Sequence, residues 1–146
     1  MRNMVIAGVL LAVGAVLAHM HVVAQSYYPM VTIAAPEGLT YIAVQDARSE
    51  RQACGAANER FLTPIKAACK ECRVVAARCE RIVQGDEEKA LLEGTPSPNY
   101  LVVAPGLRMA IEGPDASARR DCDFIAKDMM SRGMRSAVCI YPKPRA

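Results

Sequence analysis

The chain has 146 residues, of which 52% are hydrophobic, but it contains no tryptophan and only two phenylalanines. Its formal net charge of +3 is too small to indicate nucleic-acid binding. Both histidines, His19 and His21, lie near the N-terminus, so the rest of the chain has none for Ser-His-Asp, Cys-His or histidine–metal chemistry. The composition fits one small domain with an aliphatic core.

Residues 4–24 form an apolar run without Asp, Glu, Lys or Arg. Arg2 is a minimal positive region and 22–24 a small-residue cleavage site, so segment 1–24 has the pattern of a secretory signal peptide. The run is also about as long as the roughly 20 residues that a helix needs to span a bilayer. A retained anchor would then have its N-terminus inside. Both interpretations stay open, and both export the rest of the chain.

All six cysteines follow this run. Disulfides persist in exported proteins, which predicts a periplasmic or otherwise extracytoplasmic domain. If residues 1–24 are retained, the domain would be anchored in the inner membrane. A small domain with few aromatic residues gains stability from such bonds, typically about 2–4 kcal/mol each.

The first half of the domain begins after a segment, 25–38, that is expected to be a tether or an edge strand. Strands are predicted at 39–45 and 73–79. Between them a helix begins near Asp46 or Ser49. Its apolar stripe follows the spacing of one helix face and comprises Ala53, Ala57, Phe61, Ile65 and Ala68. Pro64 interrupts this stripe and is a candidate first residue of a second helix.

The second half, 99–142, follows a connector with a short helix at 86–92. Strands are predicted at 99–104, 107–112 and 136–141. A helix is predicted from Gly113 to about Arg132, because Gly133 is a typical stop signal. Its inner stripe comprises Ala118, Cys122, Ile125 and Met129. The tail 143–146 is rich in proline and lysine or arginine.

The two halves, 39–79 and 99–142, therefore repeat one plan: a strand, a helix with one cysteine, and a strand with one cysteine near its end. This order predicts an α+β domain of ferredoxin-like, split-βαβ type, internally duplicated, with both helices on one face of an antiparallel sheet. The additional strands at 27–35 and 99–104 are expected to extend the edges of the sheet.

The repeat suggests how the cysteines pair, since a helix cysteine can reach the strand beneath it. We expect the disulfides Cys54–Cys79 and Cys122–Cys139, with Cys69 and Cys72 forming a local bridge. A redox-active C-x-x-C is an alternative, although a helix C-terminus, where this pair falls, does not stabilise a thiolate. A second alternative is a zinc site made by Cys54, Cys69, Cys72 and Cys79.

Two short segments point to a family. Residues 44–53 include the pair Val44 and Gln45 at a strand end, and residues 111–117 contain Gly113 and Pro114. They resemble the sporulation-related repeat (SPOR) of bacterial envelope proteins, in which a strand ends in V-Q-x-G-x-F and the second half carries V-G-P-F. The resemblance implies a periplasmic domain that binds peptidoglycan glycan strands, with Gln45, Gly113 and Pro114 at the ligand.

No catalytic motif is present: the chain lacks a G-x-S-x-G, a P-loop and a dinucleotide-binding glycine pattern. We therefore expect a binding or accessory domain without catalytic residues, metal or cofactor, and without a nucleic-acid partner. Its expected partner is another envelope protein, with peptidoglycan binding and thiol–disulfide exchange as alternatives. A basic helix face suits an acidic partner or anionic lipid, and comprises Arg119, Arg120, Lys127, Arg132 and Arg135. Nearby methionines, Met129, Met130 and Met134, suit an adaptable contact surface.

Overall fold

The computed structural model describes residues 26–94 and 97–142. The expected signal or anchor segment 1–24 and the tail 143–146 lie outside the described residues. Within the described ranges, no helix combines the length and the hydrophobicity that crossing a bilayer requires.

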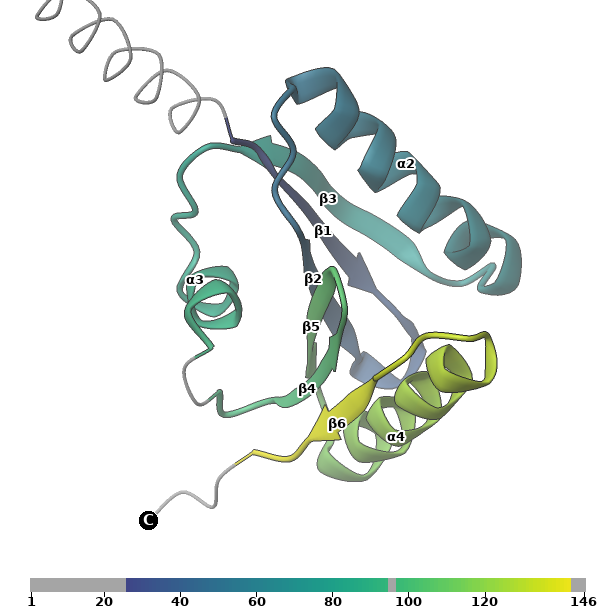
Figure 1. The fold of residues 1–146 in the computed structure, drawn as a ribbon. Helices are drawn as coiled ribbons and strands as arrows, with labels where there is room; N and C mark the ends of the chain where they lie inside the picture. The colour runs from purple at the N-terminus through teal and green to yellow at the C-terminus, as the bar shows by residue number, and fades with distance from the viewer. Residues whose placement is uncertain (1–25, 95–96, 143–146) are drawn as a thin grey trace, which may run out of the picture.

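Six strands and three α-helices follow one another in the described ranges, with one short 3-10 turn. In chain order they are β1 (Tyr28–Ala34), η1 (Pro36–Gly38), β2 (Thr40–Gln45), α2 (Arg51–Ala68), β3 (Arg73–Glu80), α3 (Asp86–Glu93), β4 (Tyr100–Ala104), β5 (Leu107–Glu112), α4 (Asp115–Ser131) and β6 (Val138–Ile140). The helices α2 and α4 cover one face of the sheet and α3 covers the other (Figure 1).

The strands form one antiparallel sheet in the order β3-β1-β2-β5-β4-β6. Each half is a hairpin, a helix and a third strand that returns to pair with the first strand of the hairpin. The halves join where β2 pairs with β5, from Thr40 opposite Glu112 to Gln45 opposite Leu107. The expected α+β class and internal repeat are present, with a β-hairpin opening each repeat.

The strand order corrects the ferredoxin-like prediction. In a ferredoxin-like sheet each outer strand pairs with a central strand from the other half. Here β3 pairs with β1 and β6 pairs with β4, so each outer strand stays within its own half. The short hairpin connections favour this arrangement, because β1 and β4 are in place before each helix returns the chain to the sheet.

The expectation that β1 and β4 form sheet edges is also wrong. Met30, Val31 and Ile33 are each at most 2% exposed, so β1 is buried on both faces, as an interior strand requires. The nearly continuous apolar sequence of β1 is typical of a strand that is buried on both faces. Pro29 is compatible with it, since it lies at the start of the strand rather than at its centre.

Helix α2 is continuous, so Pro64 does not begin a second helix. Pro64 is exposed and lies in the last turns, where water can satisfy the carbonyl group that loses its partner. Of the expected stripe, Ala57 is buried, and Phe61 and Ile65 pack against the core. The fully buried face differs from the rest of that stripe by one residue. It comprises Cys54, Ala57, Asn58 and Leu62, while Ala68 is exposed.

Three disulfides join the elements in the predicted pairs. Cys54–Cys79 links α2 to β3, and Cys122–Cys139 links α4 to β6. Cys69–Cys72 closes the turn between α2 and β3. The alternative zinc site is not formed, because all four of its thiols are paired in disulfides.

Candidate functional site

The residues that the family resemblance assigns to a ligand lie at opposite ends of the paired strands β2 and β5. Gln45 ends β2 beside Leu107, whereas Gly113 follows β5 beside Leu39. Six residue steps along β5 separate these levels, a distance of about 20 Å. The structure therefore does not bring Gln45 and the pair Gly113 and Pro114 into one site.

Gln45 has an internal partner. Its Nε2 donates to Oδ1 of Asn58 over 3.4 Å. Asn58 is only 4% exposed, and its Nδ2 donates to the backbone oxygen of Arg78 over 2.9 Å. A buried amide must be hydrogen-bonded, so Gln45 helps to satisfy the one polar side chain that α2 buries against the sheet.

Gly113 and Pro114 form a packing contact between two turns. Gly113 has φ 143°, and a Cβ atom there would lie 2.8 Å from Cδ2 of Leu39 and 2.9 Å from the oxygen of Gly38. Only glycine fits this approach without displacement of the η1 turn. The start of α4 is thus held against the β1–β2 connection.

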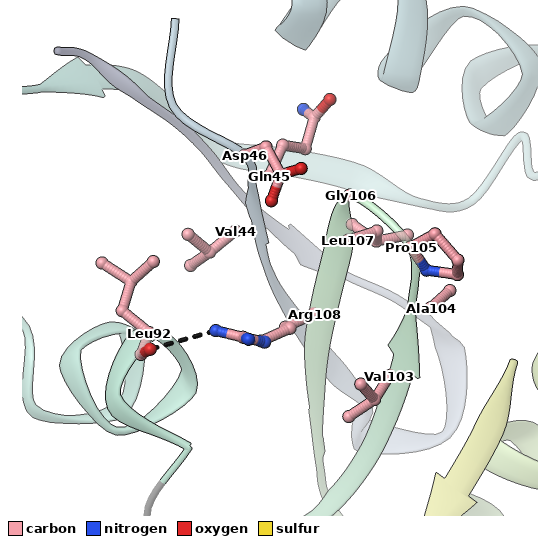
Figure 2. Close-up of a pocket in the computed structure, with 10 residues that line it drawn as sticks. All are labelled: Val44, Gln45, Asp46, Leu92, Val103, Ala104, Pro105, Gly106, Leu107 and Arg108. Carbon is pink, nitrogen blue, oxygen red and sulfur yellow. Dashed lines mark hydrogen bonds between the residues drawn. The ribbon is translucent and has the colours of Figure 1, made fainter. Parts of the chain in front are cut away.

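A shallow cleft of about 190 Å³ lies where β2 ends beside the β4–β5 turn (Figure 2). Gln45 and Asp46 border it, and Arg108 crosses its floor. The Arg108 Nη1 atom donates to the backbone oxygens of Leu91 and Leu92, over 3.1 and 3.0 Å, and so caps the C-terminus of α3. The cleft is smaller than the roughly 300–1,000 Å³ of ordinary ligand sites. Its Arg108 is already hydrogen-bonded to the backbone of α3.

The predicted basic face of α4 is divided between several local partners. Arg120 forms an ion pair with Glu37 at 2.9 Å, and Arg132 forms one with Asp128 at 2.7 Å. The Arg119 guanidinium lies 4.9 Å from the centroid of the Tyr141 ring. Lys127 and Arg135 are exposed and have no ion-pair partner in the part of the chain that the structure describes.

The acidic side chains of α4 anchor the helix to the sheet through tyrosines. Three tyrosine hydroxyls donate to three aspartates, in the pairs Tyr41–Asp121, Tyr100–Asp115 and Tyr141–Asp123. Burial, and then the bond to Asp121, raises the pKa of Tyr41 well above its usual value. Asp121 and Asp123 therefore serve different tyrosines and do not face each other.

Exposed apolar side chains gather around β6, at one edge of the sheet. We call this region the β6-edge surface; it comprises Val138, Ile140, Tyr141, Met130 and Met134. These are five of the eight large hydrophobic side chains that the described ranges expose, at 38–51% exposure. Val138 and Ile140 lie on one face of this edge, whereas Tyr141 and Met130 lie on the α4 side. Exposed apolar side chains beside an edge strand are typical of interaction sites. Of these residues, the sequence analysis singled out only Met130 and Met134. It could not predict the others, because which strand forms the free edge depends on the order of strands in the sheet.

The opposite edge of the sheet, β3, is protected. Arg73, Arg78 and Glu80 lie on it, and its register with β1 shifts between Thr32 and Ile33. Charges and irregular pairing are common means of preventing contact with other strands. The β6-edge surface is thus the edge suited to a partner.

Comparison with protein-family models, curated proteins and solved structures gives no match for this chain.

Proposed function

We propose that the protein is an exported, disulfide-stapled binding domain of the bacterial cell envelope, without catalytic activity, that binds another envelope protein through its β6-edge surface. Residues 1–24 would export or anchor it. The observation that carries the proposal is the concentration of exposed apolar side chains beside the unprotected edge strand. The three disulfides support an oxidising compartment.

Site-specific photo-crosslinking in native membranes tests this proposal. A photoreactive residue at Val138 should capture one defined envelope protein, whereas the same residue at Val75 should not. Val75 is a matched control, because it is 57% exposed and Val138 is 51% exposed, on opposite edges of the sheet. Equal capture at both positions, or none at either, would contradict the proposal.

Glycan binding at Gln45 is a second candidate, suggested by the resemblance around that residue alone, because Gly113 and Pro114 lie at the other end of the β2–β5 pair. Retention of the full chain on purified sacculi, weakened by Gln45→Ala, would support it. Because Gln45 also bonds to Asn58, the variant must be shown to unfold at the same denaturant concentration as the parent chain. Without retention of the parent chain, glycan binding is wrong.

A further inference from the structure

The outer side of β6 carries backbone groups that can accept another strand. In the described ranges β6 pairs with β4 alone, with Leu101 opposite Ile140 and Val103 opposite Val138. An edge strand of this kind is the template for strand addition, in which an extended segment of a partner continues the sheet.

The two faces of this edge differ. The Cys139 side chain points toward α4, to which it is bonded, so its neighbours Val138 and Ile140 point toward the α3 face. There they adjoin Val103 and Leu101, both half-buried. Leu101 packs in the cluster beneath α3, but Val138 and Ile140 remain about half exposed. On this face an added strand would meet apolar side chains.

On the other face, α4 borders the edge with a stripe of mixed charge. Arg119 stacks on Tyr141, Asp123 accepts from the Tyr141 hydroxyl at 2.9 Å, and the Met130 sulfur accepts from the Ala137 amide at 3.2 Å. Their three-to-four spacing places Lys127 on the same stripe. Two cations thus accompany two carboxylates, Asp123 and Asp115, which already accept hydrogen bonds from Tyr141 and Tyr100.

We propose, on the basis of the proposed function, that the partner contributes an extended strand of alternating apolar and acidic residues that pairs with β6. Its apolar side chains cover Val138 and Ile140, and its acidic side chains face Arg119 and Lys127. Alternation follows from strand geometry, because successive residues point to opposite faces. Charge complementarity then selects acidic rather than basic residues on the α4 side.

The same charges disfavour a second copy of the chain as the occupant. Antiparallel pairing of two β6 strands about Cys139 would place a twofold axis near the level of Cys122, to which Cys139 is bonded. Asp123 would then approach the equivalent Asp123, and Arg119 the equivalent Lys127. Like charges in opposition are destabilising.

Labelled peptides test the inference on the full chain in detergent. A peptide of alternating valine and glutamate should bind on the order of tenfold more tightly than one of alternating valine and lysine, as measured by fluorescence anisotropy. Binding should protect the amides of residues 138–140 from hydrogen exchange. Lys127→Glu should reduce or reverse the preference, whereas Lys66→Glu, on the exposed last turn of α2, should leave it unchanged.

The outcomes separate the two proposals. If neither peptide binds, or if protection lies away from β6, strand addition is wrong, although capture of a defined protein at Val138 would preserve the proposed function. Equal binding of both peptides overturns the acidic preference. A dimer in sedimentation that Val138→Lys dissociates would show that a second copy occupies the edge, and would overturn the inference.

Discussion

At the scale of single residues, Glu37 joins the η1 turn to α4. The Arg120 guanidinium, and then the Ser117 hydroxyl, hold the pKa of Glu37 below its usual value of 4.5. A carboxyl group with a lowered pKa in the folded state stabilises the fold above its ordinary pKa, and this contribution disappears as the pH falls through the lowered value.

Glu37→Gln should therefore lower the urea midpoint of unfolding slightly at neutral pH. The difference from the parent chain should shrink as the pH falls below 4.5. The effect is small because both side chains are more than half exposed. Glu59→Gln is the control, because Glu59 is an exposed residue of α2, and it should change the midpoint little at either pH. A Glu37→Gln difference that grows on acidification would contradict this assignment.

Gly113 is a position where an added methyl group would meet backbone, at the oxygen of Gly38. Gly113→Ala should destabilise the protein by about 2 kcal/mol in urea unfolding, because its Cβ would meet Leu39 and the Gly38 oxygen. Gly55→Ala is the matched control: its Cβ has no neighbour within 4 Å, so it should stabilise α2 by about 0.5–1 kcal/mol. Equal effects at both glycines would contradict the packing of the two turns.

The sequence was more informative about cysteines than about polar residues. A helix cysteine above a strand cysteine predicted Cys54–Cys79 and Cys122–Cys139, because a repeated plan constrains the pairing. The partner of Gln45 could not be predicted. Asn58 lies on the buried face of α2, but it is polar, so the apolar spacing of the sequence did not include it in that face.

At the scale of elements, β6 is a three-residue strand that is bonded to α4 through Cys122–Cys139 and pairs with β4. Replacing both cysteines by alanine should cost about 3 kcal/mol, given their sequence separation of 17, and should accelerate amide exchange in residues 138–140. Replacing Cys69 and Cys72 should cost less, about 1–2 kcal/mol, because only three positions separate them.

Unfolding in urea and hydrogen exchange measure both effects. Unchanged exchange at 138–140 in the variant without Cys122 and Cys139 would show that strand pairing with β4 alone holds β6. The position of the partner surface would then be independent of that disulfide.

Element types were predictable along most of the chain, whereas their arrangement was not. The segments at 107–112 and 73–79 match β5 and β3 closely, because apolar patterns and turn residues act locally. Pairing across the sheet is not local. The strand at 27–35 could be read as an edge because of Pro29, and only burial from both layers shows that β1 is internal.

At the scale of the whole molecule, the two faces of the sheet are covered differently, by α2 and α4 on one face and by α3 on the other. After β3 the chain continues into α3, which packs Leu91 against Met30, Val44 and Ala110. An ion pair between Arg78 and Glu88, at 2.9 Å, ties α3 to β3. In the described ranges α3 is the one helix on this face, and Val138 and Ile140 of β6 lie about half exposed on it. These two residues of the β6-edge surface are therefore open to a partner.

The central claim is that the chain folds as a disulfide-stapled domain outside the cytoplasm, and its state in the cell tests this most directly. Protein isolated from its native membranes under thiol-trapping conditions would be digested without reduction and mapped by mass spectrometry. We expect the linked peptides Cys54–Cys79, Cys69–Cys72 and Cys122–Cys139, with no trapped thiols. Six trapped free thiols, or a different pairing, would contradict the account.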